Sequence, residues 1–146
     1  MIPRRHSADD RGSALLEFLI VGVLVLIPLA YLVLAVMRVQ AAAYASTQAV
    51  REAGRAFVLA DTRPQAVRDS QMAADLALAD QGFELRPEAL RIRCQPAECL
   101  DPGTRIDVSL DWVVDLPWVP DAIRGAASLP IHVQHVVPVD DYRVTR

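Results

Sequence analysis

The sequence predicts an α+β protein with a long amino-terminal helix, a second helix and a small antiparallel sheet of about three strands. Three observations lead to this prediction. Residues 18–37 carry no charge. Residues 40–59 contain no proline and are rich in alanine, the best helix former. Three segments beyond residue 89 alternate apolar and polar side chains, as half-buried strands do.

The uncharged segment has the length of a membrane-spanning helix. At 1.5 Å per residue it reaches about 30 Å, roughly the thickness of the hydrocarbon core of a bilayer. We expect the helix to begin near Ser13 and to continue to Leu59, which makes it about 70 Å long. Pro28 lies inside the uncharged segment. It removes one backbone hydrogen bond and should kink the helix there.

The helix is expected to continue beyond the membrane with a row of small residues. Ala45, Ala49 and Ala53 follow one another at intervals of four and so lie on one face. Small rows let helix backbones approach closely. The row is either a packing surface, for another subunit or for the chain's own domain, or only a product of the alanine-rich composition.

A second helix is predicted from about residue 62 to Asp80. Asp61 or Thr62 can cap its start, and Pro64 is acceptable in a first turn. Gly82 is placed to end it. The apolar face expected for this helix consists of Val67, Met72, Ala73 and Leu76.

Three strands are expected to form a meander. Their inward rows are Leu90, Ile92 and Cys94; Ile106, Val108, Leu110 and Trp112; and Ile131, Val133, His135 and Val137. Residues 101–104 (Asp-Pro-Gly-Thr) predict the turn between the first two strands. The prolines of residues 116–120 exclude regular pairing before the third. The exposed half of the first helix would cover one face of this sheet.

The only two cysteines, Cys94 and Cys99, indicate the orientation of the chain. A short loop at a strand end suits a disulfide, which needs an oxidising compartment; the alternative is two free thiols in a small core. We therefore expect a single-pass protein of the cell membrane, with a cytoplasmic amino terminus. The expected parts are a cytoplasmic leader at 1–12, a transmembrane helix at 13–38, its exposed continuation at 39–60, and an extracytoplasmic α+β domain at 61–146.

Composition and motifs argue against catalysis and against nucleic-acid binding. From residue 40 onward the chain has eleven Arg and fifteen acidic residues, whereas nucleic acid requires a basic face. His132 and His135 are three apart on a predicted strand, so they point to opposite faces and cannot bind one metal ion together. Asp107, Asp111 and Asp115 would form a solvated stripe. We expect no enzyme activity, metal, cofactor or small-molecule substrate.

Glu17 is the most informative single residue. A carboxylate at the start of an apolar run is costly beside lipid unless a partner compensates for its charge. A generic signal anchor could also tolerate it, because the side chain can reach the headgroups. Glu17 follows Gly12 by five residues, with Arg11 before the glycine and Phe18 after the glutamate.

This segment, Gly12-Ser13-Ala14-Leu15-Leu16-Glu17-Phe18, resembles the amino terminus of the TadE-like family. That family comprises minor pseudopilins of the tight-adherence (Flp) branch of type IV pilus systems. Pro28, residues 51–55 (Arg-Glu-Ala-Gly-Arg) and residues 138–143 (Pro-Val-Asp-Asp-Tyr-Arg) add to the resemblance.

The resemblance implies a pilin-like fold and a structural role in pilus assembly and adhesion. A prepilin peptidase would cut between Gly12 and Ser13. Glu17 would then pair with the new amine of a neighbouring subunit. The implied partners are the membrane, the prepilin peptidase and other pilin-like subunits of the same system.

Two other functions remain open. The small residues around Ala43 and Ala45 fit a signal-peptidase site, which would release a soluble secreted module. Against this, the apolar run is longer than the 7–15 residues usual for the core of a signal peptide. The chain could also be an uncut single-pass protein with an external binding domain.

Overall fold

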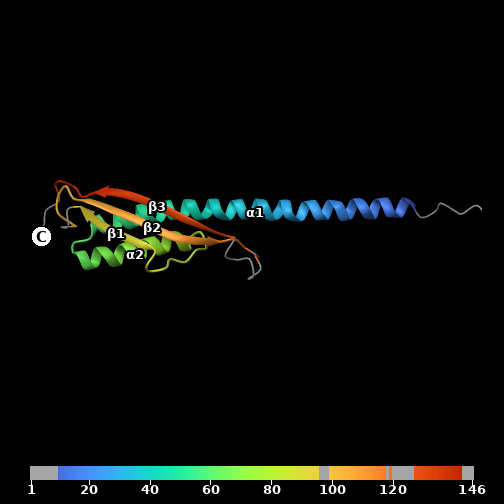
Figure 1. Ribbon diagram of the computed structural model, residues 1–146. Helices are drawn as coiled ribbons and strands as arrows, with labels where there is room; N and C mark the ends of the chain where they lie inside the picture. Colours follow the sequence, from blue (N-terminus) through green and yellow to red (C-terminus); the bar gives the residue numbers. More distant parts are fainter. Residues whose placement is uncertain (1–9, 96–98, 118, 120–126, 143–146) are drawn as a thin grey trace, which may run out of the picture. The chain divides into compact units, whose positions relative to one another are not determined.

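The computed structural model describes residues 10–95, 99–117, 119 and 127–142, and of residues 10–13 only the backbone. It confirms the predicted layout of a long apolar amino-terminal helix, a second helix and a three-stranded antiparallel sheet (Figure 1). The elements are α1 (Asp10–Leu59), α2 (Arg63–Ala79), β1 (Leu90–Gln95), β2 (Arg105–Asp115) and β3 (Ser128–Pro138). The chain divides into two compact units, one ending at Met37 and the other beginning at Arg38.

Helix α1 begins three residues before the predicted start at Ser13, so residues 10–12 of the expected leader are helical. The helix ends at Leu59, as predicted. It continues through Pro28 without interruption.

Helix α2 follows a short break and is followed by a left-handed turn at Gly82. The Thr62 carbonyl accepts a hydrogen bond from the Ala66 amide at 2.8 Å, but the Thr62 side chain makes no capping bond. The predicted side-chain cap is therefore wrong for Thr62. Beyond the helix, Gly82 has a φ of +71°, and the Phe83 amide donates to the Leu78 carbonyl at 3.0 Å. This left-handed residue ends the helix as expected.

The predicted apolar face of α2 is wrong. Met72 and Leu76 are 69% and 65% exposed. The buried residues of α2 are instead Ala66, Ser70, Ala74, Ala77 and Leu78. The reason is close packing of small side chains: the Ser70 hydroxyl donates to the Ala53 carbonyl of α1 at 2.9 Å. Such a contact favours small side chains where α2 lies against α1, and Leu78 is the one large side chain among the buried residues of α2.

The sheet is the predicted meander, with strand order β1-β2-β3 and both pairs antiparallel. In the turn between β1 and β2, the Thr104 amide donates to the Asp101 carbonyl at 3.1 Å. Gly103 has a φ of +77° there, which suits glycine at the third position of such a turn. The β2–β3 pairing ends at Asp115 opposite Ser128. Residues 118 and 120 of the predicted proline-rich loop lie outside the described residues.

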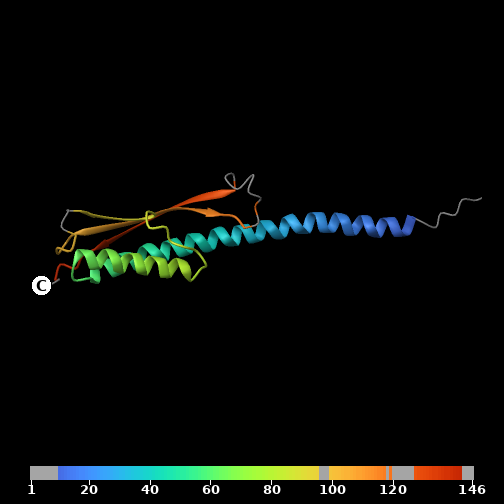
Figure 2. The same cartoon turned by 90° about the horizontal axis from the view of Figure 1, so that it is seen from below.

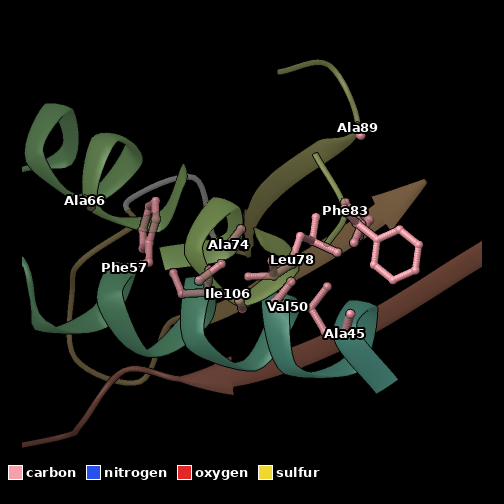
Figure 3. Close-up of a cluster of buried hydrophobic side chains, with 14 of the residues drawn as sticks. Ala45, Val50, Phe57, Ala66, Ala74, Leu78, Phe83, Ala89 and Ile106 are labelled. Atoms are coloured by element: carbon pink, nitrogen blue, oxygen red, sulfur yellow. The ribbon is translucent and has the colours of Figure 1, made fainter. Parts of the chain in front are cut away.

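The core of the second unit lies between one face of the sheet and two helices. Figure 2 shows α2 and the carboxyl-terminal part of α1 on the same side of the sheet. Ile106, Val108 and Leu110 of β2 are fully buried, while the indole of Trp112 is half-buried. Figure 3 shows Phe57 and Val50 of α1 beside Leu78 of α2 and Ile106 of β2. The predicted cover of the sheet by α1 is thus present, with α2 beside it.

Candidate functional site

The candidate site in the first unit is the amino-terminal part of α1, residues 14–37. Its large apolar side chains are exposed almost throughout: Phe18 is 77% exposed and Leu24 is 69% exposed. The helix is long and apolar enough to cross a membrane, and 6% of its most apolar window is buried. A core helix of a soluble protein would be mostly buried. The helix is therefore compatible with a membrane span, although a signal sequence near the amino terminus would have the same length and composition.

Glu17 lies on this apolar helix with its side chain exposed. Among the described residues, none holds its carboxylate by a hydrogen bond or an ion pair. Beside it, Leu16, Leu19, Ile20, Val23 and Leu24 line a shallow apolar hollow on one helix face. The only charge of the exposed run thus stands next to a surface that suits an apolar helix.

Gly12 and Ser13 lie in the first turn of α1. The first four amide groups of a helix have no partner within the helix, so this turn is the easiest to unwind. The structure places the expected cleavage bond and Glu17 on one continuous helix. Pro28 lies eleven residues further on the same helix, and its predicted kink remains a prediction.

In the second unit, the small-residue row of α1 packs against the chain's own domain. Ala45, Ala49 and Ala53 are at most 2% exposed. Gly54 lies against the sheet so closely that an added Cβ would stand 2.6 Å from Val137 Cγ2. The sequence left open whether this row packs against another subunit or against the chain's own domain. The structure shows packing against the chain's own domain.

A chain of side-chain contacts joins the start of the second unit to the sheet. The Arg38 guanidinium lies over the Phe83 ring, 3.9 Å from its centroid, and donates to the Gly82 carbonyl at 3.2 Å. Phe83 meets Trp112 edge to face with ring centroids 5.1 Å apart. The Trp112 indole then donates to the Ser46 hydroxyl at 2.8 Å. These contacts attach the first turns of the second unit to β2.

Sequence reasoning missed this chain of contacts. One signal was available: an indole on the inward face of a strand needs an acceptor, and the Ser46 hydroxyl follows Ala45 of the small-residue row. The Ser46 hydroxyl itself donates to the Ala42 carbonyl at 2.7 Å. The cation–π contact between Arg38 and Phe83 had no comparable signal, because the two residues are 45 positions apart.

Cys94 and Cys99 form a disulfide, with their Cα atoms 5.1 Å apart. The bond closes the end of β1 onto the residues that lead to the turn before β2. Cys99 is buried and Cys94 is half-buried. A disulfide of this kind belongs in an oxidising compartment.

The polar residues considered for chemistry lie on the outer face of the sheet, except His135. His132 contacts Asp111 through Nδ1 and Oδ1, and both side chains are largely exposed. His135 faces the other side of the sheet, as expected. Asp107 accepts a hydrogen bond from Gln134 at 2.5 Å, and Asp115 is exposed. In the part of the chain that the structure describes, no three His, Cys, Asp or Glu residues come together to hold a metal ion.

Comparison with models of known protein families, with curated proteins and with solved structures gives no match for this chain. Its function must therefore be inferred from the residues themselves and from their geometry. Two features stand out on these grounds: an uncovered apolar helix that carries Glu17, and a small disulfide-bonded domain packed on the continuation of that helix.

Proposed function

We propose that this chain is a minor pilin-like subunit, a pseudopilin of the TadE-like kind, that takes part in assembling a tight-adherence type IV pilus. Its role is structural. The observation that carries the proposal is Glu17, a carboxylate without a partner in the described chain, standing on an apolar helix that is otherwise uncovered. In this proposal, lipid covers the helix after membrane insertion, and neighbouring subunits cover it after assembly into the pilus.

The chemistry of Glu17 follows from cleavage of the leader. A prepilin peptidase cuts between Gly12 and Ser13 and creates a positively charged amine at Ser13. A carboxylate in lipid costs about 2.5–3.5 kcal/mol at a helix centre and less near the interface. Pairing with the amine of a neighbouring subunit offsets this cost. The pair also fixes how far one helix is displaced along the next.

The second unit is then an extracytoplasmic domain, and the amino terminus is cytoplasmic. The disulfide between Cys94 and Cys99 supports this orientation, because cytoplasmic thiols are kept reduced. The acidic balance of residues 40–146 supports contacts with proteins rather than with nucleic acid. The partners are the membrane, the prepilin peptidase and other pilin-like subunits.

The test is to replace Glu17 by Gln, which removes the charge but keeps the size of the side chain. We expect E17Q to insert into the membrane at the wild-type level but not to be incorporated into pili. Incorporation is measured as the fraction of the protein in sheared filaments and as the number of pili per cell. The matched control is Glu52→Gln on the same helix, because the Glu52 carboxylate accepts a local hydrogen bond from Gln48 and has no other partner among the described residues. Normal assembly by E17Q would refute the role of Glu17.

A further inference from the structure

Tyr31 carries the only side-chain hydrogen-bond donor of the uncharged run, residues 18–37. The side chain is half-buried, and none of the described residues holds its hydroxyl by a hydrogen bond. Tyr31 lies six residues before Met37, about 9 Å inside the run. Side chains of a helix lean toward its amino terminus, so the hydroxyl is directed further into the run. Without water at this depth, the hydroxyl needs an acceptor from protein.

Pro28 leaves a matching acceptor on the same helix. Helix α1 continues through Pro28, and a proline has no amide hydrogen to donate to the carbonyl four residues earlier. That carbonyl belongs to Leu24, which lies six residues after Phe18 and so about 9 Å inside the run from its other end. Membrane helices tolerate such a proline where another group satisfies the freed carbonyl.

The donor and the acceptor lie on one side of the helix but do not meet within one chain. Tyr31 follows Leu24 by seven residues, close to two full turns, which separates them by about 10.5 Å along the axis. The side chains of the turns between them fill the helix surface. A neighbouring helix packs with its axis about 8–10 Å away, and a tyrosine ring projects outward far enough to reach its backbone. The Tyr31 hydroxyl is therefore suited to a carbonyl of a second helix.

One displacement between two parallel copies satisfies both this pair and the pair in the proposed function. The new amine at Ser13 of one copy comes level with Glu17 of the next when the copies are displaced by four residues, about 6 Å. The same displacement brings Leu24 of the first copy level with Pro28 of the second, about 4.5 Å before Tyr31. A tyrosine that leans toward the amino terminus spans this difference.

We propose that α1 of this chain packs parallel to α1 of a second copy, displaced by about four residues, with the Tyr31 hydroxyl of one copy donating to the Leu24 carbonyl of the other. The inference rests on the proposed function for the membrane and for the direction of the displacement. The bond itself does not require the amine that leader cleavage creates. A second copy is the partner because this chain carries both the donor and the acceptor, and hydrogen bonds between helices are a common use of polar groups in lipid.

The test measures self-association of the full, uncut chain in phosphatidylcholine vesicles. Copies that carry a donor or an acceptor fluorophore are mixed, and energy transfer is followed as the ratio of protein to lipid is varied. The fluorophore is attached at Met72→Cys, a position of α2 that is 69% exposed. Labelling is done without reductant, because Cys94 and Cys99 are already bonded.

Three variants are compared with the labelled wild-type chain. Tyr31→Phe removes the hydroxyl and keeps the ring. Pro28→Ala returns an amide hydrogen to the Leu24 carbonyl and so removes the acceptor. The matched control is Tyr44→Phe, because Tyr44 is 76% exposed and lies outside the uncharged run.

We expect Tyr31→Phe and Pro28→Ala each to raise the dissociation constant of self-association about threefold, and Tyr44→Phe to leave it unchanged. The double variant of Tyr31 and Pro28 should be no weaker than the weaker single variant, because both substitutions remove the same bond. An unchanged constant for Tyr31→Phe, or a wild-type chain that stays monomeric, would overturn the inference. Effects that multiply in the double variant would also overturn it, since Pro28 would then act through the shape of the helix.

The displacement is measured by disulfide formation between two variants. Ile20 and Leu24 line the same hollow and are four residues apart. A mixture of Ile20→Cys and Leu24→Cys copies should form at least twice as much mixed disulfide as the two like pairs together. An excess of like pairs would overturn the displacement. The pilus assay of E17Q tests the proposed function separately, so loss of assembly there with unchanged association of Tyr31→Phe would overturn this inference alone.

Discussion

At the scale of single residues, the closest approach in the second unit is that of Gly54 to the sheet. A methyl group at this position would stand 2.6 Å from Val137 Cγ2. Val137 is β-branched and has little rotamer freedom with which to move away. Glycine is therefore required here by space, although it costs about 1 kcal/mol in helix propensity relative to alanine.

We predict that Gly54→Ala destabilises the domain by about 1–3 kcal/mol, the usual cost of overpacking a core. The measurement is guanidinium unfolding of the detergent-solubilised chain, followed by tryptophan fluorescence. Gly22→Ala is the control, because nothing lies within 4 Å of an added Cβ at Gly22. An unchanged midpoint for Gly54→Ala would mean that α1 does not pack this closely on β3.

The hydrogen bond between Trp112 and Ser46 is the second testable feature at this scale. We predict that Trp112→Phe and Ser46→Ala each destabilise the domain, and that the double variant shows a coupling of about 1 kcal/mol. Circular dichroism is the appropriate signal, since one variant removes a tryptophan. Strict additivity of the two substitutions would show that the bond contributes nothing to stability.

At the scale of elements, α2 shows where a sequence pattern misleads. Met72 and Leu76 follow one another at helical spacing and predict the buried face, yet the structure buries Ala66, Ser70 and Ala74 instead. Two helices that approach closely need small residues between them, and a pattern of hydrophobic residues alone does not indicate this requirement. Met72 and Leu76 are consequently left on the outside, while Leu78 is buried.

We predict a clear contrast between two leucines of α2. Leu78→Ala should destabilise the domain by about 2–5 kcal/mol, because Leu78 is fully buried. Leu76→Ala should change stability by less than about 0.5 kcal/mol, because Leu76 is 65% exposed. Denaturant midpoints of the two variants provide the measurement. Equal losses at both positions would contradict the packing of α2.

The strands and the long helix, in contrast, could be predicted from the sequence. The alternation of Ile106, Val108 and Leu110 with polar residues predicts β2 correctly, because one face of an antiparallel sheet is buried and the other is exposed to solvent. The apolar run and Glu17 could also be found from the sequence. The contacts of Arg38 with Phe83 could not, because they depend on tertiary packing between distant segments.

At the scale of the whole molecule, the chain combines two units with different surroundings. The unit up to Met37 exposes its apolar side chains, whereas the unit from Arg38 has its own core. In the proposed function the first unit passes from lipid into a filament, while the second unit remains folded throughout. The step that starts this transfer is removal of the leader, since it creates the amine that Glu17 needs.

The mature amino terminus of the protein tests this account most directly. It is determined by mass spectrometry of the chain isolated from membranes of cells with an active prepilin peptidase. The account predicts a chain that begins at Ser13. A chain beginning near Tyr44 or Ser46 would instead indicate release by signal peptidase, and a chain beginning at Met1 would indicate an uncut membrane anchor. Either of these two results would contradict the proposed role of Glu17.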